Sequence, residues 1–175
     1  MPSSRNIFKS EVKFFLNEYF SQNNITKILD VGPGEGTYSK LLPNHNLDAV
    51  EVFERYVSDY NLRDLYNEVF VDNIINFDYS GYQFIILGDI LEHLSIEDGI
   101  KLITSMDEQG IKCLVAVPFM QPQGVWGGNT YEIHLQPDLN PTTINDRYPT
   151  LNVLFTDQPN YVGGGGYGYY INFIK

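Results

Sequence analysis

The chain has 175 residues, of which 43% are hydrophobic and 14% aromatic, so it can bury a full core in the single domain that we expect over residues 1–175. Its formal net charge of −11, with scattered Lys and Arg, lacks the basic stripe of nucleic-acid-binding proteins and disfavours a nucleic-acid partner. There is no apolar run of the roughly 20 residues that a membrane span needs, and a single cysteine, Cys113, fits the reducing cytoplasm.

The first segment with regularly spaced apolar side chains lies near the N-terminus. Phe8, Val12, Phe15 and Tyr19 follow one another at spacings of four, three and four residues. Apolar side chains at this spacing share one face of a helix. The pattern therefore predicts an N-terminal helix within residues 1–24.

Short apolar runs then alternate with helical segments. Strands are expected at residues 27–32, 47–53, 67–73, 82–89 and 112–119. Helices are expected at residues 37–42, at 55–62 and after Ser95, where Asp98 three positions later resembles a capping box. This alternation predicts a parallel sheet that is covered by helices on both faces.

The C-terminal third has a different pattern. A short helix is expected at residues 141–148, and two strands at 152–158 and 167–175. Because these strands are close in sequence, an antiparallel hairpin is the simplest connection, with the glycines at 163–166 in its turn. Residues 120–140 contain Gly and Pro and show no period, which is typical of a functional lid.

The stretch LDVGPGEGTYSKLL, residues 29–42, places three glycines directly after the first expected strand. Gly32, Gly34 and Gly36 would let backbone amides approach a ligand closely at the carboxyl end of that strand. Glu51 ends the next strand 19 residues after Gly32, near the spacing of a carboxylate that binds ribose hydroxyls. The nicotinamide pattern fails, because Thr37 stands where it needs Gly or Ala.

The loop sequence G-x-G-x-G after LDV resembles motif I of the class I S-adenosylmethionine-dependent methyltransferases. Further segments resemble that family in the same order: VDNIINFD, its adenine-contacting segment; FIILGDILEHL, its D-x-x-E-H motif; and the hairpin after NVLFTDQ, its reversed seventh strand. The resemblance covers residues 27–119 well and the rest loosely. It implies an α/β fold with a Rossmann-like, doubly wound, seven-stranded, mostly parallel sheet and a C-terminal antiparallel hairpin.

The resemblance also implies S-adenosylmethionine as the cofactor and no metal ion. The methionine end would lie by the glycine loop and by the end of the fourth strand, the ribose by Glu51, and the adenine by the segments after the second and third strands. The residues implied to bind the cofactor are Asp30, Gly32, Gly34, Gly36, Glu51, Val52, Phe53, Asp72, Asn73, Gly88 and Asp89.

On the acceptor side, His93 follows the fourth strand and His134 lies in residues 120–140. Gly128, Asn129, Tyr131 and His134 form a GN-x-Y-x-x-H segment that resembles the acceptor loop of small-molecule methyltransferases. His93 and His134 are therefore the candidate catalytic residues, since histidine is the usual base near neutral pH. The structural alternative is that His93 packs beneath the next helix and His134 tethers its loop.

The sequence thus predicts a cytoplasmic enzyme, monomeric or homodimeric, that transfers a methyl group to oxygen or nitrogen of a small-molecule acceptor. Two alternatives stay open. One is a nicotinamide-dependent oxidoreductase. The other is a catalytically inactive protein of the same fold that binds S-adenosylmethionine.

Overall fold

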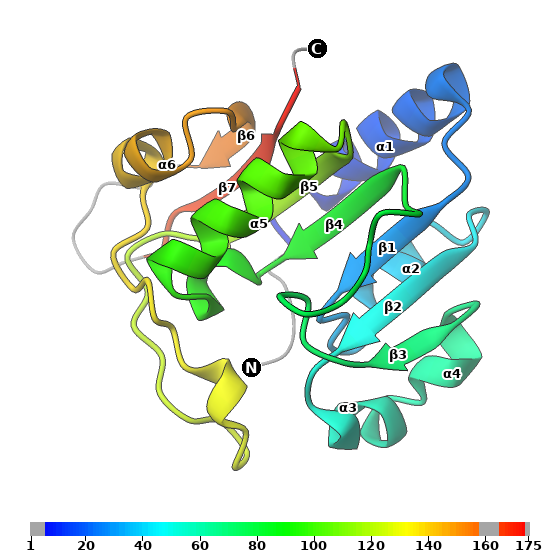
Figure 1. The fold of residues 1–175 in the computed structure, drawn as a ribbon, viewed down its shortest axis with the longest axis horizontal. Coiled ribbons are helices and arrows are strands. Elements are labelled where there is room, and N and C mark those ends of the chain that lie inside the picture. Colours follow the sequence, from blue (N-terminus) through cyan, green and yellow to red (C-terminus); the bar gives the residue numbers. More distant parts are fainter. Residues whose placement is uncertain (1–5, 158–164, 174–175) are drawn as a thin grey trace. The chain divides into compact units, whose positions relative to one another are not determined.

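The computed structural model describes residues 6–157 and 165–173. The chain divides into two compact units, one up to Ile86 and one from Leu87, and each is described by itself. The expected single domain over residues 1–175 therefore stays a prediction. The seven strands form one mixed sheet in the order β3-β2-β1-β4-β5-β7-β6 (Figure 1). This order, with its antiparallel C-terminal strands, confirms the Rossmann-like fold class.

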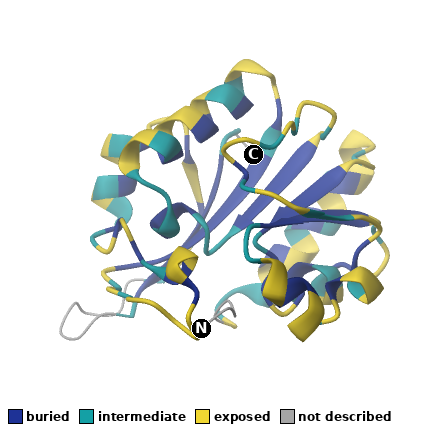
Figure 2. Cartoon of the chain, turned by 60° about the horizontal axis from the view of Figure 1, so that its bottom comes forward, coloured by how far each residue is buried: buried dark blue, intermediate teal, exposed yellow. Residues whose placement is uncertain are grey.

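The first unit holds three parallel strands and four helices. In chain order these are α1 (Lys9–Asn23), β1 (Ile28–Val31), α2 (Thr37–Leu41), β2 (Leu47–Glu51), α3 (Glu54–Asp59), α4 (Leu62–Leu65) and β3 (Val69–Val71). β2 pairs in parallel with both β1 and β3. Every residue of β1 and β2 is buried, as expected for parallel strands that are covered on both faces (Figure 2).

Helix α1 runs from Lys9 to Asn23, within the expected range of 1–24, and residues 1–5 lie outside the described part of the chain. Its buried residues are Val12, Leu16 and Phe20, spaced by four. Of the expected stripe, Val12 is fully buried and Phe15 and Tyr19 are partly buried, while Leu16 and Phe20 were not included in it. Phe20 packs edge-on against Phe84 with ring centroids 4.9 Å apart.

The helix expected at residues 55–62 is also wrong in its extent. The segment forms two short helices, because Asn61 adopts a left-handed conformation with φ 51° between α3 and α4. Asparagine tolerates this conformation better than most residues. The break turns the chain before β3.

Strand β4 (Phe84–Gly88) begins in the first unit and ends in the second. The second unit then contains η1 (Leu91–His93), α5 (Ile96–Glu108), β5 (Lys112–Pro118), η2 (Thr130–Glu132), α6 (Pro141–Arg147), β6 (Asn152–Asp157) and β7 (Tyr167–Ile171). β7 lies antiparallel between β5 and β6, which confirms the C-terminal hairpin. The expected turn over residues 163–166 lies largely outside the described residues, since 158–164 are not described.

The predicted start of α5 is confirmed. The Ser95 hydroxyl accepts a hydrogen bond from the Asp98 backbone N–H at 3.1 Å and donates to the Asp98 carboxylate at 2.8 Å. These bonds satisfy an otherwise unpaired amide at the helix N-terminus. The helix ends at Glu108. In residues 6–157 and 165–173, no helix has the length and apolar character that crossing a membrane demands.

Candidate functional site

The glycine loop connects β1 to α2 in the first unit. Gly32, Gly34 and Gly36 all have positive φ, at 56°, 53° and 76°. Residues with a side chain rarely adopt these angles. A Cβ on Gly36 would also lie 2.5 Å from the Leu65 Cδ1 of α4. The backbone itself therefore requires glycine here, whatever the loop binds.

Glu51 ends β2 and is 4% exposed. Its Oε1 accepts a hydrogen bond from the Phe53 backbone N–H at 2.8 Å, which holds the carboxylate at the strand end. Val52 and Phe53 follow and are partly exposed, and the Phe53 ring meets Tyr56 edge-on at 4.9 Å. Glu54, the other carboxylate in this segment, is exposed and begins α3.

Asp72 and Asn73 form a turn directly after β3. The Asp72 backbone N–H donates to the Glu51 carbonyl at 3.2 Å, so these two sequence-predicted residues are neighbours. The Asp72 side chain is exposed and accepts from the Asn73 N–H at 2.7 Å, and Asn73 Oδ1 accepts from the Ile75 N–H at 3.0 Å. The structure thus brings the ends of β2 and β3 together.

The glycine loop belongs to the same edge of this unit. The Gly32 N–H donates to the Val50 carbonyl at 2.8 Å, one residue before Glu51. The loop, Glu51 and Asp72 therefore follow the carboxyl ends of three adjacent parallel strands. Ligands bind at this edge in open α/β sheets.

Asp30, in contrast, lies inside β1 and is 1% exposed. The Tyr66 hydroxyl donates to its Oδ2 at 2.5 Å. Burial raises the pKa of Asp30 from its ordinary value to about 7, although the Tyr66 hydrogen bond and the charge of Lys9 lower it. Asp30 therefore stands behind the glycine loop, bound to a tyrosine that the sequence analysis did not identify.

In the second unit, Gly88 ends β4 and Asp89 follows it in a left-handed conformation with φ 57°. Its backbone N–H donates to the Ala116 carbonyl at 2.9 Å. Both carboxylate oxygens accept from the Tyr167 hydroxyl at 2.8 Å. A non-glycine residue at positive φ is strained, and such residues are found most often at functional sites. Tyr167 of β7 orients the Asp89 side chain.

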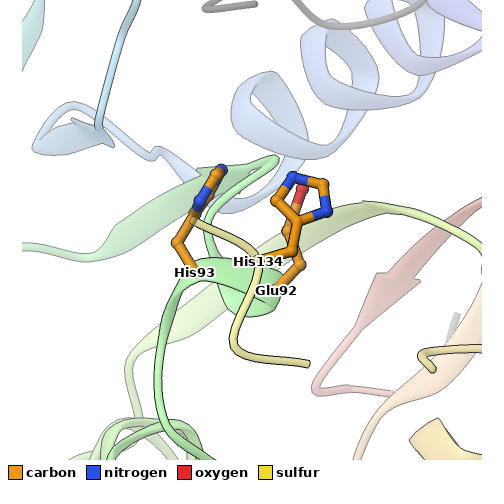
Figure 3. Close-up of side chains that lie close together, drawn as sticks. All are labelled: Glu92, His93 and His134. Atoms are coloured by element: carbon orange, nitrogen blue, oxygen red, sulfur yellow. The ribbon is translucent and has the colours of Figure 1, made fainter. Parts of the chain in front are cut away.

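Glu92, His93 and His134 come together in this unit (Figure 3). Glu92 and His93 belong to η1, and His134 follows η2. One ligand atom from each of the three side chains lies within 4.8 Å of the other two. The imidazole rings meet edge-on with centroids 4.7 Å apart. The two candidate histidines therefore lie side by side, and Glu92 lies close to both.

Backbone carbonyls orient both rings. His93 Nδ1 lies 3.3 Å from the Ile133 carbonyl oxygen, and His134 Nδ1 lies 2.6 Å from that of Gln121. A carbonyl oxygen only accepts, so each Nδ1 carries the proton in these contacts and each Nε2 keeps its lone pair. Each neutral ring thus retains one nitrogen that can accept a proton or bind a cation.

The cluster is electrostatically unusual. Glu92 is 1% exposed, and neither of its carboxylate oxygens has a hydrogen-bond partner among the described residues. Burial, together with the charges of Asp89 and Glu132, raises its pKa well above the ordinary range. Burial and the neighbouring His134 lower the pKa of His93 to about 4, and burial also lowers the pKa of His134.

Hydrogen bonds from Gln136 attach residues 120–140 to η1. The Gln136 side-chain amide donates to the Leu91 and Leu94 carbonyls at 2.9 and 3.1 Å, and its backbone N–H donates to the Glu92 carbonyl at 3.0 Å. Asn129 is 2% exposed and its Oδ1 accepts from the Tyr131 N–H. The segment also presents exposed apolar side chains, Met120, Val125, Trp126, Tyr131 and Leu135.

Sequence reasoning missed Tyr66, Tyr167 and Gln136. Each acts through a partner far away in the chain, and no local pattern marks a tyrosine or glutamine for such a role. Glu92 carried one signal, since it is the acidic residue of the D-x-x-E-H segment. Its neighbour His93 lies next to it in sequence, and the tight turn of η1 is what lets both side chains reach His134.

No protein-family model and no curated protein matches the chain. Solved structures do. A S-adenosylmethionine-dependent methyltransferase from Clostridium acetobutylicum has a TM-score of 0.63 at 13% identity, with 95% of this chain and 92% of that one covered. The methyltransferase domain of bacterial CtHen1 has a TM-score of 0.60 at 16% identity, covering 94% and 98%.

Magnesium protoporphyrin IX methyltransferase from Synechocystis, solved with bound S-adenosylhomocysteine, has a TM-score of 0.59 at 12% identity, covering 92% of this chain and 81% of that one. At these identities the likeness concerns the fold. The chain has the fold of the class I S-adenosylmethionine-dependent methyltransferases.

Proposed function

From the class I methyltransferase fold, we propose that the protein transfers a methyl group from S-adenosylmethionine to oxygen or nitrogen of a small-molecule acceptor. The observation that carries this proposal is local. Three adjacent parallel strands end in a loop with three glycines at positive φ, in a buried glutamate, and just before an aspartate. This edge is where the fold class binds its nucleoside ligand.

In the proposal, the first unit contributes most of the cofactor contacts. Glu51 accepts hydrogen bonds from the two ribose hydroxyls, and the glycine loop offers backbone amides to the methionine end. Asp30 supports that loop from within β1. The adenine would contact Val52, Phe53, Asp72 and Asn73. The second unit contributes Gly88 and Asp89 near the methionine and the reacting methyl.

The reaction is an in-line displacement. A lone pair on the acceptor atom forms the new bond to the methyl carbon, and the bond between carbon and the positively charged sulfur breaks. The electron pair of that bond stays on sulfur, which leaves S-adenosylhomocysteine. If the acceptor carries a proton, a base removes it. We propose His93 or His134 for this step, since each ring keeps an Nε2 lone pair.

The protein's remaining task is to position the acceptor and exclude water. The exposed side chains of Met120, Trp126 and Tyr131 would give the acceptor apolar and aromatic contacts. Such contacts suit a small organic molecule better than a nucleic acid, in line with the net charge of −11. The proposal places the enzyme in the cytoplasm, as a monomer or homodimer.

Isothermal titration calorimetry with S-adenosylhomocysteine tests the proposal. We expect wild-type binding and a loss of about 1–3 kcal/mol in Glu51→Gln, because the ribose hydroxyls lose a charged acceptor. Glu54→Gln is the matched control and should bind normally, since Glu54 is exposed and begins α3. Absence of binding to folded wild-type protein, or equal effects of both variants, would refute the assignment.

The same assay separates the alternatives. A nicotinamide-dependent oxidoreductase would bind NADH and ignore S-adenosylhomocysteine, which Thr37 in the loop argues against. An inactive protein of the same fold would bind S-adenosylhomocysteine and transfer no methyl group to any compound in a broad acceptor panel.

A further inference from the structure

The Glu92 carboxylate raises a problem that the proposed methyl transfer does not solve. Both of its oxygens are buried and lack hydrogen-bond partners among the described residues. Leaving a buried polar group unpaired costs free energy, and an unpaired charge costs far more. Buried charges in proteins are paired or coordinate metal ions. A bound cation would supply both Glu92 oxygens with the partner that they lack among the described residues.

We propose that Glu92, His93 and His134 bind one divalent transition-metal cation. Two imidazoles and one carboxylate form a donor set that suits zinc and similar first-row ions. Magnesium and calcium prefer sites made wholly of oxygen. The family resemblance in the sequence implied no metal ion, and His93 and His134 are 41 positions apart, which matches no common metal-ligand spacing.

The geometry is close to that of a bound site. Ligands at about 2.1 Å from a tetrahedral cation lie about 3.4 Å from one another. The three ligand atoms here lie within 4.8 Å, so the side chains need to approach by roughly 1.4 Å at most. Figure 3 shows the three side chains next to one another, so rotations about their side-chain bonds could bring the ligand atoms this much closer.

The ring orientations also favour coordination. In metal sites, a histidine ligand binds with one nitrogen while its other ring N–H donates to a carbonyl or carboxylate. Both histidines have this arrangement, with Nδ1 bound to the Ile133 and Gln121 carbonyls. The Nε2 atoms are thus the available donors, and the backbone holds both rings in the required tautomer.

Negative charge around the cluster adds to its attraction for a cation. Asp89 and Glu132 lie close enough to interact electrostatically with Glu92. Each has a polar partner of its own: Tyr167 donates to Asp89, and Gln123 donates to Glu132 at 3.2 Å. They act as surrounding charge, and the three ligands alone contact the ion.

Three protein ligands leave a coordination position open, which is typical of catalytic and not of purely structural zinc sites. If the proposed methyl transfer is correct, an acceptor hydroxyl at that position would become more acidic. The cation would then replace His93 or His134 as the group that promotes loss of the proton, since an Nε2 bound to metal accepts none. This consequence rests on the proposed function, whereas metal binding itself does not.

Calorimetry on full-length protein, treated with chelator and dialysed, tests the site with Zn²⁺ alone. We expect one equivalent to bind with a Kd of about 1 µM or tighter, and Co²⁺ to give visible absorption bands of a site with nitrogen and oxygen ligands. Glu92→Gln and His134→Gln should each weaken binding at least about tenfold. His45→Gln is the control and should bind normally, because His45 contacts Asn17 in the first unit.

A second readout guards against misfolded variants. Saturating Zn²⁺ should raise the melting temperature of the wild type and of His45→Gln by mass action. At the same Zn²⁺ concentration it should raise the melting temperature of Glu92→Gln clearly less, and circular dichroism checks that this variant is folded. No stoichiometric Zn²⁺ or Co²⁺ binding, equal binding by all variants, or binding of Mg²⁺ in place of both would each overturn the proposal. S-adenosylhomocysteine titrations of the metal-free protein report separately on the proposed function.

Discussion

Removing the hydrogen bond from Tyr66 to Asp30 should destabilise the folded protein, by an amount that depends on pH. Because burial raises the pKa of Asp30 to about 7, the folded protein holds this proton more tightly than the unfolded chain does. The stability that the protonated carboxyl gives is present at low pH and is lost as pH rises from about 4 to about 7. A shift of about 3 pKa units sets an upper limit of about 4 kcal/mol on that loss.

Tyr66→Phe removes the hydroxyl that donates to Oδ2 at 2.5 Å. At pH 8.5 the carboxylate is ionised, and losing a charge-assisted bond should cost about 1.5–3 kcal/mol in the free energy of unfolding. At pH 5.5 the carboxyl is protonated, and the lost bond is neutral and worth about 1 kcal/mol. The variant should therefore be more destabilised at the higher pH.

Urea unfolding followed by circular dichroism at the two pH values measures both effects. Tyr79→Phe, at a partly exposed tyrosine of the same unit, should change stability by less than about 0.5 kcal/mol at either pH. Asp30→Asn should flatten the pH dependence between 5.5 and 8.5, because it removes the titrating group. Equal losses for Tyr66→Phe at both pH values would refute the reasoning about the buried carboxylate.

Further substitutions test other parts of the structure. Gly36→Ala should lower stability by about 1–3 kcal/mol, because the new methyl would meet Leu65 at 2.5 Å and φ is +76°; Gly81→Ala, with no atom within 4 Å of an added Cβ, is its control in thermal unfolding. Ser95→Ala should cost about 1 kcal/mol by removing the N-cap of α5, and a loss under about 0.3 kcal/mol in urea titrations would contradict the cap. Tyr167→Phe should destabilise the protein by about 1–3 kcal/mol, since it removes the donor to both Asp89 oxygens; unchanged stability in the same titrations would show that this contact is unimportant.

Much of the fold could be predicted because its signals are local. The first four strands are short, largely apolar runs that end at or next to a glycine or an acidic residue, and Ser95 with Asp98 marks the start of α5. The glycines at 32, 34 and 36 were predictable as a sharp turn, and the structure gives each of them a positive φ. Where a local signal was ambiguous, the prediction failed, as at Asn61, where a single left-handed residue splits one expected helix into two.

The site was predictable only in part, because its chemistry depends on pairs that are distant in sequence. Tyr66 reaches Asp30 across 36 positions, and Tyr167 reaches Asp89 across 78. His93 and His134 could be named as candidates from the sequence, since one follows the fourth strand and the other lies in residues 120–140. The burial of Glu92 without a hydrogen-bond partner among the described residues could not be predicted, because it depends on how residues 120–140 pack against η1.

The central claim is that the glycine loop and Glu51 bind opposite ends of S-adenosylmethionine. A crystal structure of the protein with S-adenosylhomocysteine tests it most directly. We predict both ribose hydroxyls within hydrogen-bond distance of the Glu51 carboxylate, and the methionine end beside Gly32, Gly34 and Gly36. A nucleoside bound elsewhere, or a Glu51 side chain turned away from the sugar, would contradict the account.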